Sequence, residues 1–226
     1  LELRRAAAVL GDDVGTPPYC WVRDRAAWQL DQIGLLVDRG ALRLHQRIRT
    51  SADQPAAPCC PRPLRLGVFP VAADPLHWGH VLFSLQAMAV LGLDRVVFIV
   101  QGRDPTKRAG FGEAEEHRHH SARRTLDLLA PLVVYSDLGL GTAARGEDNV
   151  FRLLQLNAGQ SIDAWYMAGG DHNRLTDPPG EPETLPRLEA NMERRSFGYD
   201  WTRHRLRVLF ARRRGLPPTT DGPEVP

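Results

Sequence analysis

Two histidines three positions apart have the spacing and surroundings of a phosphate site. His77 and His80 lie in the stretch Asp-Pro-Leu-His-Trp-Gly-His, soon after the short apolar run 64–69. The Asp-Pro pair favours a turn, and a helix is expected to begin near residue 77. The two imidazoles would then stand one turn apart at a helix N-terminus, where backbone N–H groups and the helix dipole attract anions.

The sequence around the histidines predicts an α/β fold. From Leu64 onward, strand-like stretches alternate with helix-like ones, which is typical of a doubly wound, Rossmann-like sheet of five parallel strands. The expected strands are 64–69, 95–100, 132–135, 164–168 and 205–210, and the expected helices are about 77–91, 114–130, 148–158 and 183–194. Such a sheet binds ligands where its winding direction switches, at the carboxyl ends of strands one and four. The histidines follow strand one, and Gly169-Gly170-Asp171 follows strand four, so we expect the site there.

The same stretch resembles the HxGH signature of the nucleotidylyltransferase superfamily, which usually reads G-x-F-G-G-[ST]-F-D-P-x-H-x-G-H. The positions that match, without a gap, are Gly67, Phe69, Asp74, Pro75, His77, Gly79 and His80. The positions that depart, where Gly-Gly-Thr-Phe would be expected, are Pro70, Val71, Ala72 and Ala73. The last three still have backbone N–H groups to offer a phosphate, whereas proline has none. The resemblance therefore predicts a nucleotide-binding loop of altered shape.

Three later segments resemble further motifs of this family. The basic loop 102–108 and the following Glu-His-Arg resemble its second phosphate loop, P-P-H-K followed by H-R. The resemblance places Lys107 at the lysine and Arg118 at the arginine, where they would close over the phosphates or support that loop. The strand that ends in Gly-Gly-Asp171 resembles the GxD signature, and glycine there would let a nucleotide approach the backbone. The segment 147–154 resembles a helix that usually carries T-x-x-T-L and could contact the acceptor through Asn149. A solvated loop and simple helix capping are the alternatives for the first and third segments.

The resemblance implies an adenylyltransferase that transfers AMP from ATP to a pyridine mononucleotide and releases pyrophosphate. Mg²⁺ would arrive with ATP, and Asp171 would reach it at the phosphates, without a cage of protein ligands. The implied catalytic residues are His77, His80 and Lys107. The residues implied in nucleotide and phosphate binding are Phe69, Val71, Ala72, Ala73, Asp74, Gly79, Arg118, Gly169, Gly170, Asp171 and Arg212, and those implied in acceptor binding are Asn149 and Trp165.

Other interpretations stay open at this point. The altered loop, together with the absence of the family's C-terminal ISSTxxR motif, also fits a catalytically silent nucleotide-binding or regulatory subunit of the same fold. The acceptor could instead be another phosphorylated compound, used by a cytidylyl- or adenylyltransferase. The two histidines could simply cap and pack a helix start. A zinc site at His117, His119 and His120 is not expected, because only two of them share a helix face and no carboxylate or thiolate completes the set.

Composition narrows the class of protein. The chain has 226 residues, is 42% hydrophobic and carries a formal net charge of +2, which gives no reason to expect a nucleic-acid partner. It contains no apolar run of 18 residues, so we expect a cytoplasmic protein without a membrane partner. Its three cysteines give neither an even disulfide framework nor the paired spacing of a zinc site.

The first part of the chain carries no recognisable chemistry. Residues 1–63 are expected to form a mainly helical extension and linker, which serves packing or homo-oligomerisation, ahead of a nucleotidylyltransferase domain over 64–226. Within the extension, 26–48 suggests two short helices broken at Gly34 and Gly40. Because the chain begins with Leu and lacks the C-terminal motif, we expect both ends to be trimmed.

Overall fold

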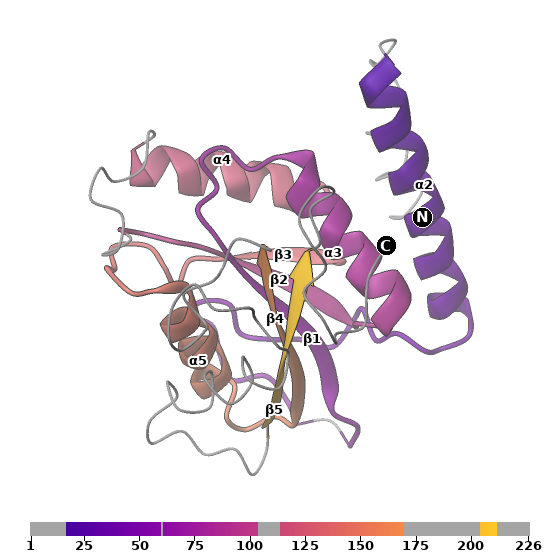
Figure 1. The fold of residues 1–226 in the computed structure, drawn as a ribbon. Helices are drawn as coiled ribbons and strands as arrows, with labels where there is room; N and C mark the ends of the chain where they lie inside the picture. The colour runs from indigo at the N-terminus through magenta and orange to yellow at the C-terminus, as the bar shows by residue number, and fades with distance from the viewer. Residues whose placement is uncertain (1–16, 60, 104–113, 170–203, 212–226) are drawn as a thin grey trace, which may run out of the picture.

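The computed structural model describes residues 17–59, 61–103, 114–169 and 204–211, which form a parallel sheet with helices on both faces (Figure 1). The strands are β1 (Leu64–Val71), β2 (Arg95–Val100), β3 (Val133–Ser136), β4 (Ile162–Gly169) and β5 (His204–Ala211). Their order is β3-β2-β1-β4-β5, and every neighbouring pair is parallel. The predicted five-stranded, Rossmann-like fold is confirmed, and its winding direction reverses between β1 and β4.

The strands form because each is a short apolar run that helices can cover on both sides. All five residues of β2 from Val96 to Val100 are fully buried. The predicted strand bounds agree with the observed ones to within two residues. The largest differences include β1, which runs through Pro70 to Val71 and pairs there with Ile99 and Val100 of β2. The loop that precedes the histidines therefore starts two residues later than the sequence suggests.

Three helices cover the faces of the sheet within the described residues. Helices α3 (Trp78–Leu91) and α4 (Glu115–Asp127) share one core layer, and α5 (Gly146–Leu156) packs on the opposite face (Figure 1). These three correspond to the predicted helices near 77–91, 114–130 and 148–158, whereas the one predicted over 183–194 lies outside the described residues. None of the helices that the structure describes combines the length and the apolar character needed to cross a bilayer.

The N-terminal extension differs from the prediction of two short helices. A single helix, α2 (Pro17–Asp38), continues through Gly34, and residues 41–59 contain no further helix. Helix α2 packs along α3, where Ala26, Leu30 and Ile33 join the same core layer. Its buried Gln29 donates from Nε2 to Oε1 of Gln86 on α3, at 2.8 Å. The prediction was wrong because this tertiary packing outweighs the low helix propensity of glycine.

Hydrogen bonds hold the irregular segment after α2, residues 41–59, against the amino-terminal side of the sheet. Asp94, fully buried just before β2, accepts hydrogen bonds from the backbone N–H groups of Arg43 (2.8 Å) and Arg65 (2.9 Å). Asn157, just after α5, bonds through its side-chain amide to the N–H and to the carbonyl of Arg49, both at 2.9 Å. Residues 43–49 therefore pack against the sheet.

Candidate functional site

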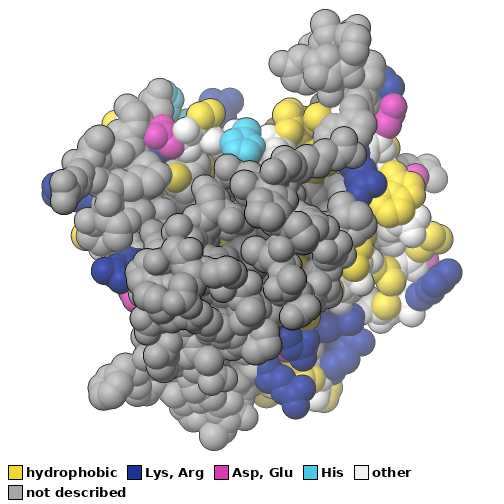
Figure 2. All heavy atoms as spheres, in the orientation of Figure 1, with side chains coloured by type: hydrophobic (Ala, Val, Ile, Leu, Met, Phe, Trp, Pro, Cys, Tyr) yellow, Lys and Arg dark blue, Asp and Glu magenta, His cyan; other side chains and the backbone are white. Residues whose placement is uncertain are grey.

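The end of β1 and the start of α3 bring both histidines to the switch point of the sheet. The register between β1 and β4 aligns Leu64 with Ile162, and both strands run for eight residues, so Val71 and Gly169 end them at the same edge. The chain then loops to His77, which is the N-cap residue of α3, and His80 follows in the first turn. Figure 2 shows histidine side chains at the surface on one face of the molecule.

The two imidazoles cap the helix through the same ring atom. Nδ1 of His77 accepts a hydrogen bond from the N–H of Gly79 (3.1 Å), and Nδ1 of His80 accepts one from the N–H of His77 (3.3 Å). The ring centroids are 3.8 Å apart. A ring nitrogen that accepts a backbone hydrogen bond carries no proton, so the proton of each neutral ring lies on Nε2. Capping thus fixes the tautomer and makes Nε2 a hydrogen-bond donor in both rings.

The exposure of the two rings differs, because β1 supports only one of them. His77 is exposed, whereas His80 is half-buried and its ring lies 5.6 Å from that of Phe69, measured between centroids. Phe69 is itself buried and contacts the rings of Phe83 and Phe98, at 5.5 and 5.2 Å. Phe69, a predicted nucleotide-site residue, therefore packs in the core, where it limits how the His80 ring can turn.

The loop between β1 and α3 has an unusual backbone. Ala73 has a φ of 51°, in the left-handed region that residues with a Cβ atom seldom adopt, and its side chain is buried. The carbonyl of Val71 accepts a hydrogen bond from the N–H of Gln101 (2.8 Å), and the carbonyl of Ala72 accepts one from Arg118. Protein donors therefore occupy these two carbonyls. Phosphate binding by the N–H groups of Val71, Ala72 and Ala73 stays a prediction, as does a role of Gly79 or the half-buried Asp74.

Arg118, a predicted phosphate ligand, lies buried beside this loop. Its Nη1 donates to the carbonyls of Ala72 and Gln101 (2.9 Å for Gln101), and its Nη2 donates to the carbonyl of Gly102 (2.9 Å). Only 2% of the residue is exposed. Burial lowers the pKa of Arg118 from its usual value, and the negative charges of Asp74 and Glu115 oppose that shift. An arginine stays protonated in such a setting, so a full positive charge lies behind the loop.

The start of α5 reaches the same edge of the sheet, because a helix that follows a parallel strand begins at its carboxyl end. Asn149, in the first turn of α5, is fully buried. Its Oδ1 accepts a hydrogen bond from Nη1 of Arg152 (3.2 Å), while its Nδ2 has no partner among the residues that the structure describes. A buried donor without a partner costs about 1–3 kcal/mol, so this amide suits a polar ligand atom.

Other predicted residues are not brought together with the histidines. Trp165 pairs with Gly67 and lies four residues before the end of β4, which is about 13 Å from the carboxyl edge at ~3.3 Å per residue. Its ring is buried and packs under the guanidinium of Arg207, 4.8 Å from the ring centroid. Four further predicted residues lie outside the described part of the chain: Lys107, Gly170, Asp171 and Arg212.

The three histidines of α4 have different surroundings. His119 is buried and its Nδ1 lies 2.7 Å from the hydroxyl of Tyr135, whereas His117 and His120 are exposed. Among the residues that the structure describes, no three His, Cys, Asp or Glu side chains converge closely enough to hold a metal ion.

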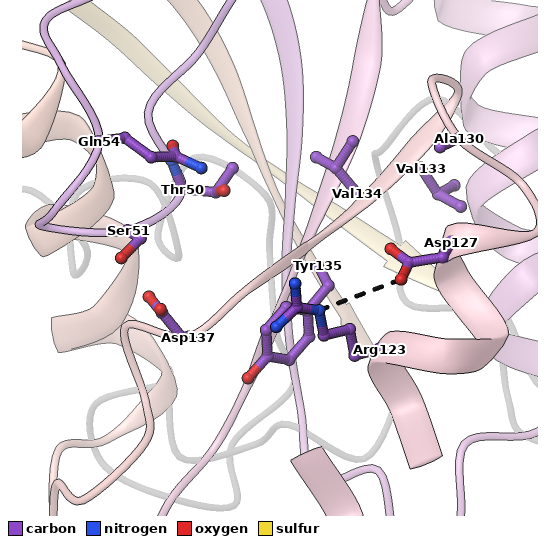
Figure 3. Close-up of a pocket in the computed structure, with 10 residues that line it drawn as sticks. All are labelled: Thr50, Ser51, Gln54, Arg123, Asp127, Ala130, Val133, Val134, Tyr135 and Asp137. Atoms are coloured by element: carbon purple, nitrogen blue, oxygen red, sulfur yellow. Dashed lines mark hydrogen bonds and ion pairs between the residues drawn. The ribbon is translucent and has the colours of Figure 1, made fainter. Parts of the chain in front are cut away.

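A separate cavity of about 370 Å³ lies beside the edge strand β3 (Figure 3). Thr50, Ser51 and Gln54 of the irregular segment form one wall, and Tyr135 and the end of α4 form the other. None of the site residues predicted from the sequence lines this cavity. Sequence reasoning missed it because its walls come from segments that are far apart in the chain and carry no shared motif.

Comparison with known proteins gives partial similarities. No family model matches the chain. A probable nicotinate-nucleotide adenylyltransferase of Thermus thermophilus is 30% identical over 113 residues, which cover 45% of this chain and 61% of that protein. Proteins of the same name are 44% identical over 46 residues in Rubrobacter xylanophilus (20% of this chain, 22% of that protein) and 27% identical over 139 residues in Herpetosiphon aurantiacus (61% and 69%). The chain thus spans less than two thirds of the length of the Thermus relative.

Proposed function

We propose that this protein is an adenylyltransferase that transfers AMP from ATP to a pyridine mononucleotide, either nicotinate mononucleotide or a close analogue. The main support is the position of His77 and His80 at the N-terminus of α3, where the winding of the sheet reverses. Both rings already have a backbone donor on Nδ1, so both are prepared to donate from Nε2. The names of the curated relatives point to the same activity.

In the proposed reaction the protein positions and stabilises, without forming a covalent bond. A phosphate oxygen of the acceptor attacks the α-phosphorus of ATP in line, the bond from that phosphorus to the bridging oxygen breaks, and pyrophosphate leaves with the bond's electrons. Nε2–H of His77 and of His80 would donate to the α- and β-phosphates, where negative charge grows. The N-terminus of α3 would add its dipole, and Lys107 would add a further positive charge.

Mg²⁺ would come with ATP. No side-chain cage for it exists among the described residues, and the half-buried Asp74 is the described carboxylate closest in sequence to the histidines. Mg²⁺ is commonly held by substrate phosphates with one or two carboxylates, an arrangement that Asp171 could complete. The ion would neutralise charge on the phosphates.

The acceptor would lie against the start of α5, on the other side of the switch point. Asn149 is proposed to donate from its unpartnered Nδ2 to this molecule. A carbonyl or carboxylate oxygen on the pyridine ring would satisfy that donor.

The test is pyrophosphate release by the full chain with ATP and Mg²⁺, in the presence of nicotinate mononucleotide, nicotinamide mononucleotide or a phosphorylated acceptor of another class. We expect release with one of the two pyridine nucleotides, together with a dinucleotide product in the mass spectrum. Release only with the third compound would reject the acceptor. Binding of ATP without release for any acceptor would favour the silent nucleotide-binding subunit.

A further inference from the structure

The first turns of α4 join three loops at the carboxyl edge of the sheet. Arg118 donates to the carbonyls of Ala72, after β1, and of Gln101 and Gly102, at the end of β2. One helical turn earlier, Oε1 of Glu115 accepts a hydrogen bond from the N–H of Gly141, after β3. Loops that follow three neighbouring strands are therefore fastened to one helix.

We propose that Arg118 is a positioning residue, which holds the loop before His77 in the shape that the transferred phosphate requires. The proposal rests on the proposed function, and it replaces direct phosphate binding by Arg118. Ala72 lies five residues before His77, so the guanidinium holds the start of the segment proposed to contact phosphate and joins it to Gly102 after β2.

The packing of these loops leaves little room for adjustment. A Cβ atom on Gly102 would collide with the carbonyl oxygens of Gly139 and Thr142, and the N–H of Arg103 donates to the carbonyl of Thr142 at 2.8 Å. Because these loops pack tightly against one another, we expect the loss of one contact to displace them together. A displacement of about 1 Å at a reacting group can cost about 100-fold in rate.

The contacts of the guanidinium also argue against direct ligation. Nη1 carries two hydrogens, and both are used, on Ala72 and on Gln101. A third hydrogen, on Nη2, is used on Gly102, and the residue is 2% exposed. Three of the five guanidinium hydrogens are thus held by carbonyls, and the low exposure of the residue keeps a phosphate in solvent away from the group in this arrangement. While these hydrogen bonds are made, the positive charge of Arg118 lies behind the loop that precedes His77. The planar guanidinium holds the backbone of that loop in one shape.

Arg118→Lys is the informative variant, because it keeps the charge but cannot reach three carbonyls in a plane. Arg124→Lys, an exposed position on the same helix, is the matched control. We expect kcat for pyrophosphate release to fall about 10- to 100-fold in Arg118→Lys, with KM for ATP within about threefold of wild type. Amide hydrogen exchange at residues 72–76 and 101–103 should accelerate in that variant and stay unchanged in the control. A rise in KM for ATP with unchanged exchange would identify Arg118 as a phosphate ligand and overturn the proposal.

A measurement on the wild-type protein decides the matter even if Arg118→Lys does not fold. The side-chain N–H signals of Arg118 should be protected from solvent exchange, and they should keep their NMR shifts when ATP and Mg²⁺ are added. Large shifts on addition of ATP, or rapid solvent exchange without it, would overturn the proposal. Absence of pyrophosphate release from wild type would instead reject the proposed function, because exchange and NMR report on the loops without turnover.

Discussion

Under the proposed function His77 would use different ring atoms for its two roles, because Nδ1 caps α3 and Nε2 would donate to a phosphate. His77→Asn separates them, since asparagine is among the best N-cap residues but has no donor at the Nε2 position. We expect stability within about 0.5 kcal/mol of wild type and pyrophosphate release reduced about 100-fold. His77→Ala should lose the donor and also about 1 kcal/mol of stability. Urea unfolding and a release assay measure the two effects, and wild-type turnover in His77→Asn would show that Nε2 is not needed.

His119 should make stability depend on pH. Burial lowers the pKa of His119 below 6.5, and the negative charge of Glu115 only partly opposes that shift. Burial also raises the pKa of Tyr135 to about 12, so the phenol keeps its proton, and its hydroxyl lies 2.7 Å from Nδ1 of His119. Because the unfolded chain takes up a proton at higher pH than the folded one, this site lowers the free energy of unfolding as pH falls below about 6.5.

His119→Gln removes that titration while keeping a polar side chain beside Tyr135. Between pH 7.5 and pH 5.5, the free energy of unfolding should therefore decrease more in wild type than in the variant, as measured by urea denaturation at each pH. The exposed His120→Gln serves as the control and should follow wild type. Equal pH dependence in His119→Gln and wild type would mean that the buried imidazole does not resist protonation.

The strands are predictable one by one from the sequence, whereas α2 is not. A central parallel strand is apolar on both faces, so its composition alone marks β1, β2 and β4. At Gly34 local propensity disfavours helix by about 1 kcal/mol. Whether the helix continues through Gly34 instead depends on Leu30 and Ile33, which become buried only when α2 lies on α3. Local signals cannot contain that information.

Two glycine substitutions test this account of the elements. A Cβ atom on Gly34 meets nothing within 4 Å, so Gly34→Ala should raise the free energy of unfolding by about 1 kcal/mol through helix propensity. A Cβ atom on Gly139 would collide with the carbonyl oxygen of Val100, so Gly139→Ala should destabilise the protein by about 1–3 kcal/mol. Urea denaturation measures both. A loss of stability in Gly34→Ala would indicate that α2 is interrupted there.

At the scale of the whole molecule, the arrangement of strands around the proposed site is predictable from the sequence, whereas the contacts that hold its loops are not. The HxGH spacing is local, and a parallel sheet with strand order β3-β2-β1-β4-β5 puts the ends of β1 and β4 together. The burial of Arg118 depends on three loops meeting one helix, and that of Asn149 depends on how α5 docks against the sheet. No residue spacing encodes either contact, so the sequence left two roles open for Arg118, binding phosphate or supporting the loop.

Asp94 makes the irregular segment part of the folded body, at the edge opposite the proposed site. Each of its two carboxylate oxygens accepts a backbone N–H, from Arg43 and from Arg65, and Nη2 of Arg43 lies 3.3 Å from Oδ2. Asp94→Asn leaves only one acceptor oxygen and turns an amide N–H₂ group toward a backbone donor. We expect a loss of about 1–3 kcal/mol in the free energy of unfolding, whereas Asp53→Asn, at an exposed position, should match wild type.

Asp94→Asn also tests whether the amino and carboxyl edges of the sheet are coupled. Asp94 precedes β2, whereas His77 follows β1 at the carboxyl edge, so a rigid sheet lies between them. Under conditions in which Asp94→Asn remains folded, pyrophosphate release should therefore stay within about twofold of wild type, since no contact with the reacting groups changes. A folded but inactive Asp94→Asn would contradict this separation, and it would mean that the segment after α2 influences how β1 presents the loop to the phosphates.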